Sequence, residues 1–329
     1  MRYLTGFAAL LLLAACTSDP GAGPILIETE KVALYPDTPE RLDVGALEYR
    51  GGLVLTSPDQ RFGGLSAMEI EDGRLLAISD SAYWLTAHLE FDDAGMLTGL
   101  SQAFYAPMLD AEGKHLTGDF ADAEGLAPLG NGAFAVSFER EHRIDRYDLS
   151  PDWSGMAIAT PTPLPVPPGL DRLRDNGGIE ALAPAEGGYW AGIEYPIIEG
   201  QPHSIWLMRE GEEPYVINYP AEAGFGLTSL TRVGANVIAL ERFYSRDIGN
   251  RARIVLLDSN LSNLAPGSTA LVAMNYPDGM AELEPGMTID NFEGIAVGHV
   301  NGEMRLFILS DNNFSGRQRT LLLSFAFTE

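Results

Sequence analysis

Residues 124–139 read EGLAPLGNGAFAVSFE: a glycine opens an apolar run, Asn131-Gly132 follows, and a second apolar run ends on an acid. Asn-Gly between two apolar runs is a strong β-hairpin signal, because a type I′ turn needs positive φ at both central residues. The stretch therefore predicts two short antiparallel strands joined by a tight turn.

The same plan occurs five times along the chain. The units open at Gly64, Gly125, Gly178, Gly226 and Gly294, with spacings of 61, 53, 48 and 68 residues, and their turns carry Asp72-Gly73, Asn131-Gly132, Gly187-Gly188, Gly234-Ala235-Asn236 and Asn301-Gly302. A looser pair of strands follows each hairpin, which gives about four antiparallel strands per unit. A four-stranded sheet repeated at this period is typical of a β-propeller blade.

The predicted fold class is therefore all-β, with residues 25–329 forming a single β-propeller. The 36 Gly and 21 Pro among 329 residues agree with a turn-rich architecture. Two arrangements are open for the N-terminal stretch Leu42 to Ser57. It can pair with the C-terminal run Thr320 to Phe327 and close the ring, or it can form part of a further blade. We expect six blades in preference to five.

The first residues have the composition of an export signal. Arg2 precedes an apolar stretch that is too short to span a bilayer, and Leu13-Ala14-Ala15-Cys16 resembles the lipobox of bacterial lipoproteins. The resemblance implies removal of residues 1–15, acylation of Cys16, a tether over residues 16–24, and a place in the cell envelope, periplasm-facing and at the outer membrane. The alternative is an ordinary secretory signal with an incidental cysteine. Cys16 is the only cysteine, so disulfides and cysteine chemistry are excluded from the folded domain.

Acidic residues dominate the chain, whose formal net charge is −25. Such a surface repels nucleic acid and anionic lipid, so we expect no nucleic-acid partner and no membrane contact except through the lipid on Cys16. The sequence does not indicate which oligomeric state the protein adopts. Only two lysines accompany 19 arginines, and arginine is the better bidentate partner for carboxylate or phosphate.

Several acids recur at matching places in the repeat. Glu124 and Glu293 stand where first strands start, and second strands end on Asp80, Glu139, Glu194, Glu241 and Asp311. Because the two strands are antiparallel, both sets should meet at one mouth of the central channel. The alternative is that these acids only cap turns and keep loops soluble.

Seven carboxylates around one opening would repel each other unless cations accompany them. Arg140 and Arg242 follow two of the acids, and further oxygen donors are available at Asp119, Asp122, Asp175-Asn176, Asp290-Asn291 and Asp311-Asn312-Asn313. Ca²⁺ takes six to eight oxygen ligands, so we expect Ca²⁺ first, then Mg²⁺ or Mn²⁺. The five histidines lie at no ligand-like spacing. Only His142 is placed to face the mouth as a base, although an ordinary polar loop histidine explains it as well.

The segments at 63–82, 122–149, 176–184 and 290–327 resemble the phytase-like family, also described as having esterase-like activity of phytase. The resemblance covers roughly residues 40–328 and implies a propeller with ester or phosphoester hydrolysis as its activity. The residues that match the family's segments are Glu124, Gly125, Glu139, Arg140, Glu180, Glu293, Gly294 and Asp311 to Asn313.

These observations together predict a metal-dependent hydrolase acting on a small-molecule ester or phosphoester. The expected metal ligands are Asp80, Glu124, Glu180, Glu194, Glu293, Asp311 and Asn312. Arg140 and Arg242 are expected to hold developing negative charge, and Glu139 or Glu241 to act as the base. The alternatives are a non-catalytic, calcium-stabilised binding lipoprotein and a lactonase-type metal propeller.

Overall fold

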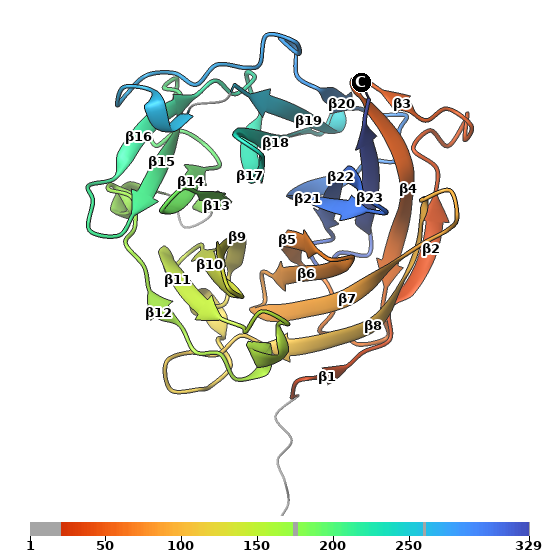
Figure 1. Ribbon diagram of the computed structural model, residues 1–329, viewed down its shortest axis with the longest axis horizontal. Coiled ribbons are helices and arrows are strands. Elements are labelled where there is room, and N and C mark those ends of the chain that lie inside the picture. Colours follow the sequence, from red (N-terminus) through yellow and green to blue (C-terminus); the bar gives the residue numbers. More distant parts are fainter. Residues whose placement is uncertain (1–20, 174–176, 259–260, 329) are drawn as a thin grey trace, which may run out of the picture.

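The computed structural model describes residues 21–173, 177–258 and 261–328. Its strands form five antiparallel sheets around a central axis (Figure 1). The described connections include four 3₁₀ helices, at Gly118–Phe120, Ser154–Ala157, Leu170–Arg172 and Leu261–Asn263. None of the helices in these residues could cross a lipid bilayer. The predicted all-β propeller is confirmed.

In each of the first four blades four consecutive strands are ordered from the axis outward, and the first of the four lies innermost. Blade 1 consists of β5 (Leu65–Glu71), β6 (Arg74–Ser79), β7 (Tyr83–Phe91) and β8 (Leu97–Pro107), with β1 (Gly23–Pro24) on its outer edge. Blade 2 consists of β9 (Ala123–Gly130), β10 (Ala133–Phe138), β11 (Arg143–Asp148) and β12 (Thr162–Pro163). Blade 3 consists of β13 (Ile179–Ala185), β14 (Gly188–Ile193), β15 (His203–Arg209) and β16 (Tyr215–Tyr219). Blade 4 consists of β17 (Gly226–Val233), β18 (Asn236–Ser245), β19 (Gly249–Leu257) and β20 (Ala281–Leu283).

Blade 5 joins the two ends of the chain. Its inner three strands are β21 (Asn291–Val300), β22 (Glu303–Asp311) and β23 (Thr320–Phe327), and its outer strands are β4 (Leu47–Thr56) and β2 (Glu28–Val32), with β3 (Asp43–Val44) paired to β4. β4 runs antiparallel to β23, with Leu53 opposite Leu322.

The expected sixth blade is wrong: the propeller has five blades. The N-terminal stretch that weakly resembles the repeat is one long strand, β4, which buries Leu47, Tyr49, Leu53 and Leu55. It supplies the fourth strand that the C-terminal run lacks. Because the same strand cannot also open a separate sheet, closure of the ring removes the sixth blade.

The apolar core is divided among the five interfaces between neighbouring blades. Between blades 1 and 2, for example, Trp84 packs edge-on against Tyr147, with ring centroids 5.5 Å apart. Five separate apolar clusters account for the buried apolar residues in this way. Each blade is therefore held by its two neighbours, and the axis itself is left for polar side chains.

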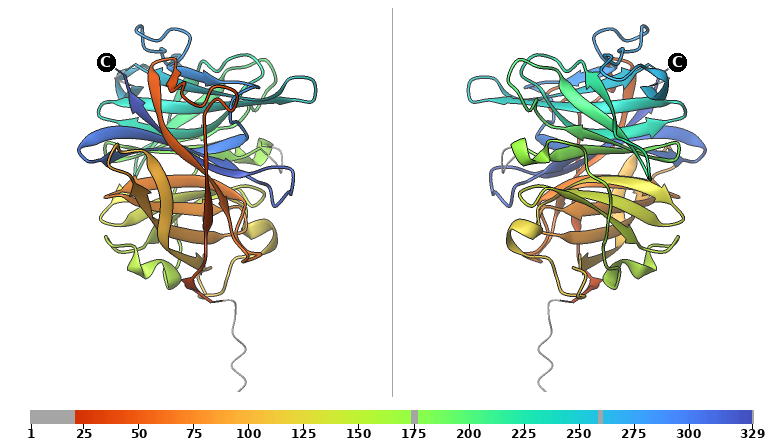
Figure 2. Two further views of the ribbon diagram at one scale, coloured as in Figure 1. Left: turned by 90° about the vertical axis from the view of Figure 1, so that its right-hand side faces the viewer. Right: turned by 90° about the vertical axis from the view of Figure 1, so that its left-hand side faces the viewer.

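The inner hairpins decide which side chains reach the axis. Asp72-Gly73, Asn131-Gly132 and Asn301-Gly302 all have positive φ at both residues, as the predicted turns require. These turns lie at one end of the axis, so the starts of β5, β9, β13, β17 and β21 lie at the other end, which we call the mouth face. The hairpin of β18 and β19 and the loop between β22 and β23 project on this side (Figure 2).

Candidate metal centre

A β-bulge occurs at the same place in all five inner strands. The pairing with the second strand shifts by one residue at Ser66, Glu124, Glu180, Thr228 and Glu293. A bulge leaves one residue unpaired and re-aims its side chain. The five residues form a ring at the mouth end of the axis, and three of them are glutamates.

The residues that follow the bulges are all small: Ala67, Gly125, Ala181, Ser229 and Gly294. The inner strands approach each other closely here. A Cβ added to Gly125 would lie 2.6 Å from the carbonyl oxygen of Glu180 in the next blade. Small side chains at this place therefore let the glutamates of neighbouring blades come together.

A second ring comes from the ends of the second strands. On the mouth side of each bulge, one residue of the second strand is paired directly next to the bulge, and the residue that follows it belongs to this second ring. In blades 1 to 5 these residues are Asp80, Glu139, Glu194, Arg242 and Asp311. Four of the five second-strand acids named from the sequence thus occupy equivalent places. In blade 4 the equivalent residue is Arg242 and not Glu241.

Glu241 lies on the opposite side of its strand and does not line the mouth. Its side chain is buried, accepts a hydrogen bond of 2.6 Å from the Tyr219 hydroxyl, and pairs at 2.6 Å with Arg253. Successive side chains of a strand point to opposite faces, so an offset of one residue moves a side chain from the channel into the blade. The prediction that Glu241 acts as a base at the channel mouth therefore disagrees with the structure, because its side chain does not reach the mouth.

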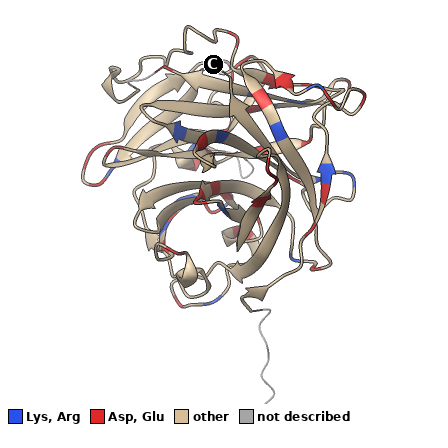
Figure 3. Cartoon of the chain, turned by 45° about the vertical axis from the view of Figure 1, so that its right-hand side comes forward, with Lys and Arg blue, Asp and Glu red and all other residues tan. Residues whose placement is uncertain are grey.

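The two rings enclose a cavity of about 250 Å³. Every residue that lines it is charged or an asparagine: Asp80, Asp122, Glu124, Glu139, Arg140, Glu180, Glu194, Arg242, Asn291, Glu293, Asp311 and Asn313. Eight carboxylates therefore face two guanidinium groups. Acidic residues also occur on the outer loops and strand ends (Figure 3), so the net charge of the chain is not confined to this cavity.

Most of the site residues predicted from the sequence lie together around this cavity. Of the residues predicted as ligands or catalytic groups, only Glu241 and Asn312 are not among the lining residues. Cys16, the predicted lipidation site, lies outside the described residues. The amide oxygen of Asn312 accepts the backbone N–H groups of Gly64 (3.0 Å) and Phe314 (3.1 Å). Asn313 lines the cavity in its place. Asp175 and Asn176 also lie outside the described residues.

Three carboxylates are close enough to share one cation. Oxygen atoms of Asp122, Glu124 and Glu139 lie within 4.8 Å of one another. Asp122 had been named only as an oxygen donor next to Glu124, because nothing in the sequence shows that it faces the axis. The residue at its place is glycine in blades 1, 3 and 4 and Asn291 in blade 5. An all-oxygen set of this kind fits a hard cation.

Burial, followed by repulsion between neighbouring carboxylates, raises the pKa of several carboxyl groups of the cavity. Burial raises the pKa of Asp80 to about 6 and the pKa values of Glu139 and Asp311 to about 7 each. Burial, and next the charge of Glu293, raises the pKa of Glu124 well above its ordinary value. Unpaired buried carboxylates are costly, and a bound cation removes that cost.

Both arginines of the cavity are held by its acids. Arg242 donates to Glu194 at 2.8 Å and to Asn291, and lies 3.9 Å from Glu293. Burial alone would lower the pKa of Arg242, but the carboxylates of Glu293, Glu194 and Glu180 raise it. Arg140 is half-exposed and pairs with Asp122 and, at 3.7 Å, with Asp119.

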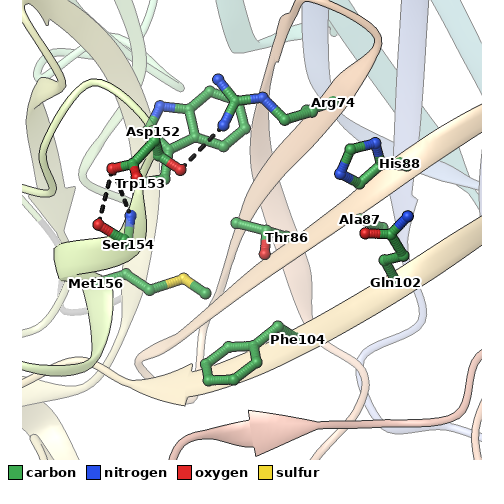
Figure 4. A pocket seen from close by; sticks show the side chains of 10 residues that line it. All are labelled: Arg74, Thr86, Ala87, His88, Gln102, Phe104, Asp152, Trp153, Ser154 and Met156. Atoms are coloured by element: carbon green, nitrogen blue, oxygen red, sulfur yellow. Dashed lines mark hydrogen bonds between the residues drawn. The ribbon is translucent and has the colours of Figure 1, made fainter.

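Three other cavities are larger but hold no comparable chemistry. One, of about 370 Å³, lies beside β2, β4 and the start of β8, and Asp92 is the single carboxylate in its lining. A second, of about 310 Å³, lies between strands β6–β8 of blade 1 and the segment 152–156, where Arg74 stacks on Trp153 and His88 and Gln102 line the same cavity (Figure 4). A third, of about 750 Å³, lies between blades 2 and 3 and includes Pro128, Pro163 and Pro184. None of the three contains a cluster of carboxylates, so we assign the candidate centre to the mouth.

Comparisons with known proteins agree with the fold. No curated protein sequence matches the chain. An α-L-arabinofuranosidase from Podospora anserina, solved with cellotriose, shares 10% identity over 86% of this chain and 97% of its own, with a TM-score of 0.50. At this identity the likeness shows the fold alone.

Two further solved structures match more loosely. The endosialidase of phage phi92 shares 10% identity over 92% of this chain, which spans 58% of the endosialidase, with a TM-score of 0.38. A gluconolactonase-like protein shares 13% identity over 91% of this chain and 93% of its own, with a TM-score of 0.41. The family model described as phytase-like, "esterase-like activity of phytase", matches residues 60–314. That range holds four complete blades and both rings of the mouth, and the chain therefore belongs to the phytase-like family.

Proposed function

We propose that the protein is a calcium-dependent hydrolase of an ester or phosphoester, with its reaction at the mouth of the channel. The observation that carries the proposal is the cavity in which eight carboxylates from all blades except blade 4 meet Arg140 and Arg242. Membership in the phytase-like family supports hydrolysis as the reaction.

Calcium fits the donor set better than a softer metal does. The triad of Asp122, Glu124 and Glu139 offers only carboxylate oxygens, and Asp80 and Glu293 lie nearby as further donors. When bound there, Ca²⁺ would supply positive charge to an ester or phosphoryl oxygen and would acidify a coordinated water.

The chain's own residues then divide the remaining work. Arg242 is fixed by Glu194 and Asn291, so its guanidinium is pre-oriented toward a developing negative charge. Asp311 lies in the same cavity outside the triad, and its pKa of about 7 suits a general base near neutral pH. We therefore propose Asp311 as the general base and Glu139 as a metal ligand.

Phytate itself is a poor candidate substrate. It is densely anionic, whereas the chain has a net charge of −25 and both arginines of the cavity are already paired with acids. The same pairing favours one alternative function, a non-catalytic role in which calcium only ties the blades together at the axis.

The N-terminal segment supports a location of this activity in the cell envelope. The lipobox-like Leu13-Ala14-Ala15-Cys16 supports acylation of Cys16 and a position at the outer membrane, facing the periplasm. In a bacterial host with lipoprotein processing, Cys16→Ala should move the protein from the membrane to the soluble fraction. Retention of the variant in the membrane fraction would remove the lipid from the proposal.

Assays on p-nitrophenyl acetate, p-nitrophenyl phosphate and a simple lactone test the reaction. We expect turnover on at least one of them, loss of turnover in EDTA, and recovery with Ca²⁺. Glu124→Gln should reduce kcat/KM at least a hundredfold and weaken the calcium response, because it removes a triad ligand. A folded, calcium-stabilised protein without turnover on any of the three would favour the non-catalytic role.

A further inference from the structure

The mouth-face loops carry most of the exposed apolar side chains. Among the described residues eleven large apolar side chains are exposed, and six lie on these loops or, for Tyr244, at the end of β18 beside one of them: Phe120, Tyr195, Ile198, Tyr244, Ile248 and Phe314. As whole residues, Phe120, Tyr195 and Phe314 are 53%, 47% and 47% exposed. A single exposed apolar residue needs no explanation, but a group around one opening marks a binding surface.

Phe314 lies directly beside a cavity carboxylate. A Cβ added to Gly64 would stand 2.6 Å from the ring of Phe314 and 2.1 Å from Oδ1 of Asp80. The ring of Phe314 also lies against Gly63. The glycine pair before β5 thus makes room for an aromatic ring at the edge of the cavity.

Tyr195 repeats the arrangement two blades away. A Cβ added to Gly226 would stand 3.0 Å from the ring carbon Cζ of Tyr195 and 3.0 Å from the carboxylate of Glu194. Tyr195 directly follows Glu194, whose carboxylate accepts a hydrogen bond of 2.8 Å from Arg242 of the cavity. Between these two places, at Gly178, the neighbouring ring is that of His142.

In all three places an aromatic ring that follows a second-strand acid packs on the glycine before the next inner strand. In this arrangement the carboxylates face the cavity and the aromatic rings lie at its opening. The cations of the cavity are bound to acids, so the opening attracts an apolar or ring-shaped group more strongly than a polyanion.

We propose that Phe314 and Tyr195 form an aromatic clamp for the organic group of the substrate, which is a neutral or singly esterified compound carrying a ring. The inference rests on the proposed function, because it takes the reacting ester to lie in the acidic cavity below the clamp. Each ring-on-ring contact strengthens binding beyond the effect of the apolar area that it buries.

Binding of two unreactive analogues to the full chain tests the clamp. In saturating Ca²⁺, calorimetry should give phenylphosphonate a dissociation constant about tenfold lower than methylphosphonate, which has the same charged group without the ring. Phe314→Ala with Tyr195→Ala should cut that preference to about twofold and leave the methylphosphonate affinity unchanged. Leu271→Ala, at an exposed residue of the β19–β20 loop on the opposite face, is the matched control and should keep the preference.

Equal affinities for the two analogues, no binding of either, or a preference that survives the double variant would overturn the clamp. If the alanine variants unfold, Phe314→Leu with Tyr195→Phe is the substitute, because it keeps side chains packed on both glycines. This variant should still bind phenylphosphonate at least about threefold more tightly than methylphosphonate, which is half of the tenfold preference on a logarithmic scale. If the protein prefers phenylphosphonate but hydrolyses no ester, the proposed hydrolase function is wrong and the aromatic clamp stands. If the protein hydrolyses an ester but binds the two analogues equally, the clamp is wrong and the hydrolase function stands.

Discussion

At the scale of single residues, one position of strand register separates the cavity from the core. Glu241 and Arg242 are neighbours, yet Arg242 faces the carboxylates of the mouth, whereas Glu241 is buried between Tyr219 and Arg253. Glu124 and Glu241 are therefore both largely enclosed glutamates with opposite surroundings. Glu124 is surrounded by like charge, and Glu241 has a cation and a hydroxyl donor.

This contrast predicts opposite effects of the same substitution. Glu241→Gln removes the nearer of the two carboxylates that pair with Arg253, with Glu222 left at 3.6 Å, and should lower the free energy of unfolding by about 2 kcal/mol without changing the calcium response. Glu124→Gln relieves repulsion and should raise the stability of the metal-free protein while weakening calcium stabilisation. Chemical denaturation with and without Ca²⁺ measures both. A loss of calcium response in Glu241→Gln would show that its placement outside the site is wrong.

At the scale of elements, the hairpins were predictable and the bulges were not. A turn has a local residue signature, and the Asp-Gly and Asn-Gly pairs place all three of the turns that carry them. A bulge is one unpaired residue, defined only by the partner strand. The sequence comparison consequently aligned Gly125 and Gly294 with Gly64, although the structure makes them equivalent to Ala67, three residues later in the repeat.

The misalignment explains which site residues were recognised from the repeat. Glu124 and Glu293 are followed by glycine and were found at strand starts. Glu180 occupies the same bulge but precedes Ala181, and only the family resemblance pointed to it. Asp122 has glycine as its counterpart in three other blades, so the repeat carried no signal for it.

The glycine before β5 gives a prediction at this scale. Gly64→Ala introduces a Cβ at φ +59°, 2.1 Å from Asp80 Oδ1, so the carboxylate and the Phe314 ring must both move. Calcium affinity should fall at least tenfold. Gly73→Ala has a similar φ of +72° with no atom within 4 Å of the new Cβ, and it should cost stability only. Calcium titrations of the two variants make the comparison, and equal affinities would argue against a metal at this edge of the cavity.

At the scale of the whole molecule, ring closure decides the blade count. The pairing of β4 with β23 joins residues from opposite ends of the sequence, and no local pattern specifies such a partner. Both outcomes for Leu42 to Ser57 were compatible with its alternating apolar residues. Closure also brings Asp311 and Glu293 of blade 5 next to Asp80 of blade 1 and Glu124 of blade 2. The acidic cavity is thus a property of the closed ring and of no single blade.

That property predicts how the stability of the whole propeller depends on pH. Burial raises the pKa values of Asp80, Glu139 and Asp311 from the ordinary range near 4 to about 6, 7 and 7. A group whose pKa is raised on folding stabilises the protein while protonated, and this stabilisation is lost as pH rises toward the folded-state value. Without metal, the melting temperature should therefore fall between pH 5 and pH 8.

Saturating Ca²⁺ should reduce or reverse that fall, because the metal binds the ionised carboxylates. Added salt should change it little, since salt screens exposed charges far more than those enclosed in the cavity. Calorimetric melting at pH 5 and pH 8, with EDTA or Ca²⁺ at low and high salt, separates these contributions. Asp80→Asn with Asp311→Asn should flatten the metal-free profile. A metal-free melting temperature that rises from pH 5 to pH 8 would mean that the eight carboxylates do not share one enclosed space, and the metal centre would have to be abandoned.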